Sequence, residues 1–182
     1  MTETQATLDP SARGGKYLTF VLGREEYGVE ILKVREIIGY VEVTAVPCTP
    51  PYVRGVINLR GQVISVIDLR AKFGMEPAPR TEQTCVIVVD IRRDGRRLNL
   101  GIVVDRVSEV LDMPAAQIED APSFGTTVDT SFIRGMGKVG AGVKILLDID
   151  RVLTTEEAAG LASLAAAEVA AQAPHEVGAA NH

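Results

Sequence analysis

The feature of the sequence that most constrains its fold is an internal repeat. Residues 27–38 match residues 100–111 at an offset of 73 positions. Residues 63–73 match residues 143–153 at an offset of 80 positions, so the second copy has gained a few loop residues. Chance similarity between two Val/Ile-rich stretches is the alternative, but glycine, charged and capping residues recur in the same order. The pattern therefore favours a duplication, in which two small β units pack face to face because neither buries enough surface alone.

Each copy contains a hairpin, and in the first copy a short helix follows it. Residues 56–69 are two strands rich in β-branched side chains around a tight Arg60-Gly61 turn. Gly61 adopts the positive φ of such a turn without steric cost. Asp68 is a good N-cap and Gly74 a good helix stop, so a single helical turn is predicted between them.

Other elements follow from runs of β-branched residues and from turn signals. We expect strands at 17–22 and 27–31, a helical turn at 30–33, a strand from Val34, and strands at 84–91 and 98–104 around Asp94-Gly95. The prolines at positions 47, 50 and 51 mark an irregular loop that cannot lie in a central strand.

The chain closes with a predicted helix. Thr154 and Glu157 have the spacing of a capping box before an alanine-rich run, and Pro174 ends that run. The sparse apolar face of this helix consists of Leu161, Leu164 and Val169. We expect that face to dock on the same chain rather than on a partner.

Composition argues against several classes of partner and compartment. Hydrophobic residues make up 46% of the chain but aromatic residues only 4%, and Trp is absent, so Val, Ile and Leu fill the core. The net charge of −5 argues against nucleic acid or an anionic membrane as the main partner. The N-terminal residues lack a signal-peptide pattern, and no apolar run approaches the ~20 residues of a membrane span. We therefore expect a soluble, cytoplasmic protein.

Little in the sequence points to catalysis, a metal or a cofactor. His175 and His182 are the two histidines, and both fall in the expected tail. Cys48 and Cys85 have no neighbouring His, so they are interpreted as reduced, structural thiols rather than zinc ligands. No carboxylates are paired at a spacing that suggests acid–base work. We expect no enzymatic activity, no metal and no cofactor.

Two motifs resemble binding signatures without their structural context. Residues 135–140 spell the dinucleotide fingerprint, but a strand follows them instead of the helix that meets a pyrophosphate. By the repeat, this segment is the counterpart of the Arg60-Gly61 hairpin. The basic cluster at Arg92, Arg93, Arg96 and Arg97 flanks a hairpin tip without aromatic neighbours, which favours a solvated turn over a nucleic-acid patch.

Glu36 is the most unusual charged residue, because it lies in an otherwise apolar strand. It has two interpretations. In the first, Glu36 forms an ion pair with Arg60 at the first hairpin, and the pair shapes a binding face. In the second, these are two exposed charges that contribute about 0–1 kcal/mol if they meet at all. The sequence leaves both open.

Four blocks between about Lys16 and Ala170 carry a specific resemblance. They are residues 26–37, the segment 54–61 with its Asn-Leu-Arg-Gly motif, residues 66–70, and residues 101–107 with their Gly-Ile-Val-Val-Asp motif. Together they resemble the CheW family of chemotaxis coupling proteins.

The resemblance implies a mainly β fold. It consists of two similar five-stranded SH3-like β-barrels packed together, with short helical turns and a C-terminal helix. We expect a disordered N-terminus at 1–15, a CheW-like domain at 16–154, a helix at 155–173 and a flexible tail at 174–182. Within the domain, two interwoven subdomains are expected at roughly 27–75 and 84–153, with the first strand at 16–22.

The resemblance also implies a function and partners. It implies a non-catalytic adaptor that couples methyl-accepting chemoreceptors to the histidine kinase CheA. The partners are the cytoplasmic tip of the receptors and the CheA regulatory domain, with mixed CheW–CheA rings and without nucleic acid or direct membrane insertion. A regulatory subunit of another kinase system is the alternative that the sequence leaves open, and an enzyme with a bound cofactor or metal is the third.

Specific residues follow from the family's motifs. The receptor-binding groove maps onto Val34, Glu36, Arg60, Cys85, Gly101 and Val110. In this set Arg60 supports Glu36. Phe124 resembles an aromatic residue with which the family's second barrel contacts the kinase. The chain departs from the family at the 92–97 hairpin, which is longer and more basic, and beyond Pro174, where the tail is extended.

Overall fold

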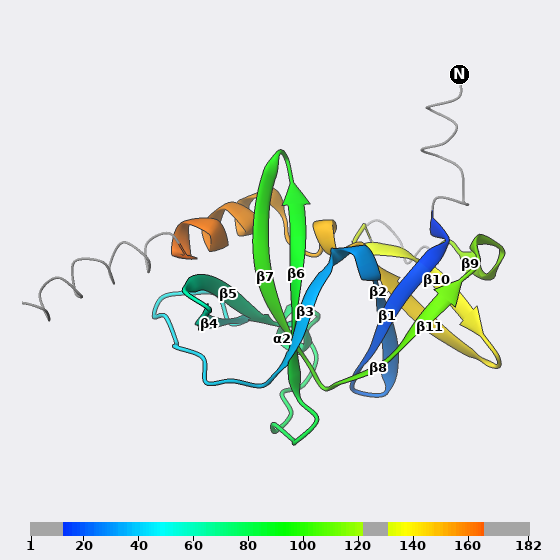
Figure 1. The fold of residues 1–182 in the computed structure, drawn as a ribbon, viewed down its shortest axis with the longest axis horizontal. Coiled ribbons are helices and arrows are strands. Elements are labelled where there is room, and N and C mark those ends of the chain that lie inside the picture. Colours follow the sequence, from blue (N-terminus) through cyan, green and yellow to red (C-terminus); the bar gives the residue numbers. More distant parts are fainter. Residues whose placement is uncertain (1–12, 122–130, 166–182) are drawn as a thin grey trace, which may run out of the picture.

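Two β-sheets form the body of the described structure (Figure 1). The structure is a computed structural model that describes residues 13–121 and 131–165. Sheet A has the order β8 (Arg106–Met113), β1 (Gly15–Leu22), β2 (Glu25–Glu30), β11 (Gly142–Leu147), β10 (Ile133–Val139) and β9 (Ile118–Glu119). Sheet B has the order β3 (Val34–Gly39), β6 (Cys85–Arg93), β7 (Arg96–Val104), β5 (Gln62–Asp68) and β4 (Val53–Leu59).

Short helical segments join the strands. They are η2 (Ile31–Lys33), α2 (Leu69–Lys72), η3 (Ala115–Gln117) and η4 (Ile149–Arg151), and a terminal helix begins at 155 and is described to 165. The mainly β fold with two related sheets, short helical turns and a C-terminal helix is confirmed.

The two sheets have the same internal order, as a duplication requires. Five strands of sheet A follow the order β8, β1, β2, β11, β10. Their counterparts in sheet B follow the same order, as β3, β6, β7, β5, β4. The register agrees as well. Leu146 lies opposite Gly28 in the parallel pair of sheet A, and Val66 lies opposite Gly101 in the parallel pair of sheet B. These pairs are related by the repeat offsets of 80 and 73 positions.

The chain crosses between the sheets at two equivalent places. After β2 in sheet A, the turn η2 leads into β3 in sheet B. After β7 in sheet B, Asp105 leads into β8 in sheet A. Each sheet therefore combines strands from both of the expected subdomain ranges, 27–75 and 84–153.

Each barrel closes where its second hairpin meets the chain that follows the edge strand. In sheet B, Thr44 and Val56 exchange two backbone hydrogen bonds of 2.9 Å. A Cβ on Gly55 would lie 2.0 Å from the Thr44 carbonyl oxygen, so only glycine fits there. In sheet A, Gly135 has the same role beside β9, where a Cβ would lie 2.5 Å from Ile118 Cγ2. The two-residue strand β9 makes sheet A six-stranded instead of five-stranded.

The hairpin, cap and turn predictions are confirmed. Arg60 and Gly61 both have positive φ, of 52° and 87°, as a two-residue turn between twisted strands requires. The Asp68 carboxylate accepts a 2.9 Å hydrogen bond from the Arg70 amide at the start of α2. At the equivalent place, the Asp148 carboxylate accepts from the Asp150 amide at 3.2 Å. Residues 135–140 form the β10–β11 hairpin and not a nucleotide loop.

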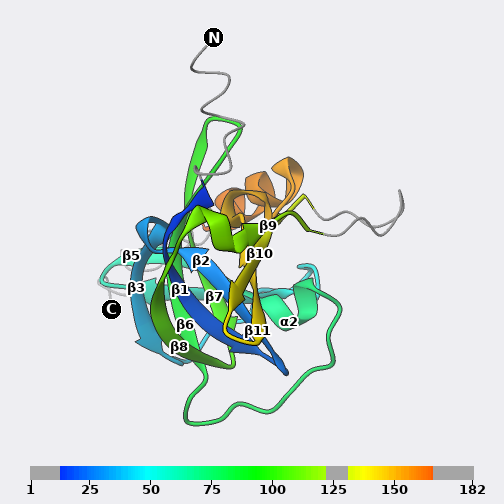
Figure 2. The same cartoon turned by 90° about the vertical axis from the view of Figure 1, so that its right-hand side faces the viewer.

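The core has three parts. The largest contains side chains from both sheets and from the terminal helix, whereas two smaller clusters fill the interior of sheet B and of sheet A separately. The rings of Phe20, Tyr27, Phe73 and Phe132 stack in a row, with consecutive centroids 5.9, 5.9 and 5.1 Å apart. Figure 2 shows the strands of both sheets and α2 in the perpendicular view.

The terminal helix docks on the same chain. The Glu157 amide donates to Thr154 Oγ1 at 3.1 Å, and the Thr154 amide donates to Glu157 Oε1 at 2.8 Å, so the predicted capping box is present. Leu161 is buried in the shared core and Leu164 packs against it, which confirms the docking of this face. Val169 and Pro174 lie outside the described residues.

The N-terminal boundary differs from the expectation of disorder through residue 15. Gly15 already belongs to β1, and Arg13 pairs with Asp120 at 2.7 Å. The Tyr17 hydroxyl also donates to the Arg13 carbonyl at 2.5 Å. Residues 13–15 are thus ordered by long-range contacts that the local composition does not reveal. Residues 1–12 lie outside the described residues.

Candidate functional site

The edge strand β3 is the centre of the candidate site. Within the described chain it pairs with β6 on one side, which leaves its other edge available. Val34 packs against the shared core, whereas Ile37 points outward and is 44% exposed. The register shifts between Val34 and Glu36, and such a bulge redirects the side chains that follow it. The strand therefore exposes polar and apolar side chains together.

The Glu36–Arg60 ion pair exists and lies beside this edge. Arg60 Nη2 donates to Glu36 Oε1 at 2.5 Å and to Oε2 at 2.8 Å. The Arg60 side chain is 68% exposed and that of Glu36 is 28% exposed, so the pair contributes at most about 1 kcal/mol to stability. Between the two alternatives for these charges, the structure supports their meeting. The exposure of both side chains keeps the energy of the pair small.

The second edge strand, β8, repeats part of this surface. It is at the end of sheet A and pairs with β1 within the described residues. Val110 lies on it and is 49% exposed. By the repeat offset of 73, Val110 is the counterpart of Ile37. Each sheet thus exposes one apolar side chain at the same point of its edge strand.

Two of the predicted groove residues lie inside the protein. The Cys85 side chain belongs to the shared core, and Gly101 is buried in the central strand β7. A Cβ on Gly101 would lie 2.9 Å from Val86 Cγ1, so strand packing accounts for this glycine. Neither residue presents a side chain at the surface of β3. Phe124, the predicted kinase contact, lies outside the described residues.

The two cysteines are expected to differ sharply in reactivity. Burial raises the pKa of the Cys85 thiol, whereas Cys48 is exposed in the proline-rich loop. Since the thiolate is the reactive form, a thiol-specific reagent will modify Cys48 in the native protein at least about 100-fold faster than Cys85. Mass spectrometry of partially modified protein measures both rates. Equal rates would contradict the buried position of Cys85, and unfolding in urea is the control that equalises them.

Sequence reasoning missed a pair of ionic clamps at the crossovers. Asp105 accepts hydrogen bonds from Arg70 at 2.9 and 2.6 Å and from the Gly23 amide at 2.8 Å. The Arg70 guanidinium holds the pKa of the Asp105 carboxyl below its usual range, against the opposing effect of burial. This clamp ties α2 and the β1–β2 turn to the crossover that leads into β8.

The second clamp lies at the other crossover, and there the cation is on the crossover and the carboxylate is on the segment after the hairpin. Asp150, which is the counterpart of Arg70 at an offset of 80, accepts from Lys33 Nζ at 2.8 Å. Its other oxygen accepts from the Arg92 amide at 2.7 Å. Lys33 lies in the η2 crossover. A search for equal residues at equal offsets does not find the clamps, because Asp150 stands where the first copy has Arg70, and Leu32, next to Lys33, stands 73 positions before Asp105.

Two other kinds of feature are absent from the described residues. They contain no group of three or more His, Cys, Asp or Glu side chains arranged to hold a metal ion. Across the same residues, no helix is long and apolar enough to cross a membrane. The fold instead offers two exposed edge strands, each with an apolar side chain, on a doubled barrel. These features define a protein-binding module.

The chain belongs to the CheW family: residues 16–157 match the CheW-like domain. It is 47% identical over 146 residues to the chemotaxis protein CheW of Klebsiella aerogenes, an alignment that spans 80% of this chain and 86% of that protein. Identity to CheW of Rhizobium meliloti is 35% over 144 residues, or 79% and 90% of the two chains. The crystal structure of the scaffolding protein TtCheW from Thermoanaerobacter tengcongensis is similar, with a TM-score of 0.67, 34% identity, and coverage of 76% and 92%.

Proposed function

We propose that this protein is a non-catalytic adaptor that couples chemoreceptors to the histidine kinase CheA in the cytoplasm. Membership of the CheW family supports a scaffold in chemotaxis and not an enzyme. The single observation that carries the receptor contact is the exposed edge of β3, with Ile37 outward and the Glu36–Arg60 pair beside it.

In this proposal the receptor tip binds along β3. Val34 and Glu36 form the floor and the polar border of the contact, and Arg60 holds the Glu36 carboxylate in place. Cys85 and Gly101 act indirectly, because they pack the strands β6 and β7 that support β3. Val110 extends the contact onto the edge of sheet A.

An adaptor transmits a signal only if it distinguishes the signalling states of its partner. A receptor that shifts the kinase between active and inactive states must therefore make different contacts with β3 in each state. The CheA regulatory domain binds elsewhere on the protein, with Phe124 as the proposed aromatic contact. In this proposal the two proteins alternate in mixed rings.

Reversing the charge of Glu36 tests the receptor contact. Glu36→Lys sets two cations against each other at the border of β3, and we expect receptor binding to fall at least about tenfold, or 1.4 kcal/mol. The measurement is co-sedimentation with receptor-containing membranes and CheA, with kinase activity read in the same tube. Thermal unfolding of the variant remains close to that of the parent, because the ion pair contributes little to stability.

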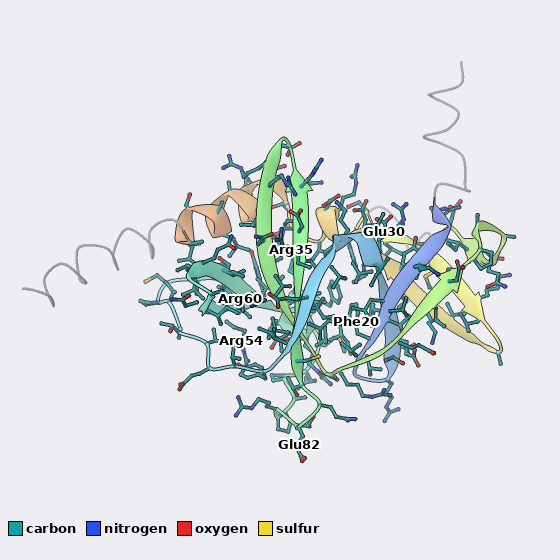
Figure 3. All side chains as sticks on the ribbon, viewed as in Figure 1. Phe20, Glu30, Arg35, Arg54, Arg60 and Glu82 are labelled. Carbon is teal, nitrogen blue, oxygen red and sulfur yellow. The ribbon has the colours of Figure 1, made fainter. Side chains whose placement is uncertain are left out.

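Glu82→Lys is the matched control. Glu82 is exposed in the segment between the two halves of the chain, and it lies at the lower tip of the molecule in Figure 3, apart from Arg60. It carries the same change of two charge units. If both variants lose receptor binding equally, net charge and not the β3 site is responsible. If a well-folded Glu36→Lys variant sediments and activates like the parent, the receptor assignment is wrong.

A further inference from the structure

A polar depression extends from the Glu36–Arg60 pair toward the β6–β7 hairpin. Two adjoining hollows, of about 180 and 420 Å³, share the side chains of Arg35, Gln62 and Asn99. The smaller hollow contains the ion pair itself, and the larger one reaches Arg97 and the terminal helix. The depression is therefore continuous with the proposed receptor surface. Arg35 and Arg60 both lie on the half of the molecule formed by sheet B (Figure 3).

The hydrogen-bond donors in this depression exceed the acceptors. Both of its carboxylates are already paired, Glu36 with Arg60 and Asp90 with Arg97 at 2.5 Å. Within the described chain, no hydrogen bond engages the side chains that the hollows share, those of Arg35, Gln62 and Asn99. These neighbouring guanidinium and amide donors suit a ligand that accepts hydrogen bonds and carries negative charge.

The local charge is opposite to that of the whole protein. The depression and the hairpin above it contain six arginines, at positions 35, 60, 92, 93, 96 and 97, and three acids, at positions 36, 90 and 94. The net local charge is therefore +3 on a chain whose net charge is −5. The hairpin projects beyond the body beside the terminal helix (Figure 1), and a hydrogen bond from Thr155 to Asp94 fixes it there. This arrangement steers an acidic partner toward the depression.

The lining favours a polypeptide over a free anion. Leu59, Ile64, Leu98, Ala162 and Ala165 form apolar parts of the wall between the polar groups. A small inorganic anion makes no use of such a wall, whereas the aliphatic stems of glutamate side chains pack on it. Nucleic acid is disfavoured, because no aromatic side chain in either hollow offers a base a stacking surface.

We propose that this depression binds a carboxylate-rich segment of a partner protein. One carboxylate lies between the Arg35 guanidinium and the amides of Gln62 and Asn99, and a second lies against Arg97. The site goes beyond the proposed function, since it depends on side chains outside the receptor set and remains if β3 serves a different partner. It provides a second, charge-selective contact beside the first.

The test uses the full-length protein and a ten-residue peptide of alternating Glu and Ser. Titration followed by NMR is expected to shift the side-chain amide signals of Gln62 and Asn99. Arg35→Gln is expected to raise the dissociation constant by about tenfold, and the double variant with Arg97→Gln to remove binding. The control Arg24→Gln removes an exposed arginine from the β1–β2 turn and leaves binding unchanged.

The comparison probes define the outcomes that overturn the site. A peptide of alternating Gln and Ser must not bind. Equal shifts with inorganic phosphate indicate a small-anion site, and equal binding of an oligothymidine indicates a general polyanion surface. Loss of peptide binding by Arg24→Gln to the same extent indicates non-specific charge. Absence of shifts at Gln62 and Asn99 rejects the depression, while unchanged receptor co-sedimentation in that case leaves the proposed function intact.

Discussion

Replacing Gly55 by alanine is expected to lower the free energy of unfolding by about 3 kcal/mol or more. The new Cβ would lie 2.0 Å from the Thr44 carbonyl oxygen and 3.0 Å from the Ala45 Cα, and the backbone φ is +141°. The chain can accommodate the methyl group only by breaking the Thr44–Val56 bridge that closes the barrel of sheet B. Urea unfolding followed by circular dichroism measures the loss, since the chain contains no Trp for fluorescence.

Two other glycines provide graded controls for this substitution. Gly61 has a φ of +87°, but an added methyl group would meet no atom within 4 Å, so Gly61→Ala is expected to cost about 1–2 kcal/mol from backbone strain alone. Gly39 has neither a positive φ nor a close neighbour, and Gly39→Ala is expected to be nearly neutral. If Gly55→Ala were no more destabilising than Gly39→Ala, the close approach of Thr44 would not exist in solution.

Replacing Asp105 by asparagine is expected to destabilise the protein by about 2 kcal/mol at pH 7. The change leaves Arg70, whose side chain is 17% exposed, without its counter-charge at the crossover into β8. Because the pKa of Asp105 is lowered in the folded state, its contribution is present in full above the unfolded pKa, near 4. That contribution disappears as the pH falls through the folded pKa, so parent and variant converge in acid.

Urea unfolding at stepwise lower pH measures this convergence, and Asp90→Asn is the matched control. The pKa of Asp90 is also lowered, by its hydrogen bond with Arg97, but Arg97 is 61% exposed. We expect that substitution to change stability by no more than about 1 kcal/mol. Two results would contradict the prediction that the Arg70–Asp105 pair stabilises the crossover. One is an equal loss of unfolding free energy in the two variants, and the other is a loss in Asp105→Asn that persists in acid.

Local chemistry in the sequence predicts the elements but not their assembly. The Arg60-Gly61 turn, the Asp68 cap and the capping box at Thr154 depend on residues within a few positions, and the structure has all of them. Sheet A combines strands of both halves of the chain through the parallel pair of β2 and β11, whose residues are more than 100 positions apart. No local propensity distinguishes a strand that stays in its sheet from one that crosses to the other.

The candidate site shows the same division. The sequence isolates Glu36 as a charge in an apolar strand, and the structure brings it to Arg60. The family resemblance maps Cys85 and Gly101 onto the groove although both lie inside the protein, because a motif fixes residue types and not exposure. The hydrogen-bonding capacity of Arg35, Gln62 and Asn99 becomes visible only when three strands place them around one depression.

Because of the two crossovers, strands from both halves of the chain pair with one another in each sheet. Of the nine strand pairings among the described residues, four join a strand before residue 75 to one after residue 84: β1 with β8, β2 with β11, β3 with β6, and β5 with β7. A cut in the connecting segment would leave two fragments interlocked through both sheets. The turn η2 joins β3 of sheet B directly to β2 of sheet A, so a displacement of β3 is transmitted to the other barrel.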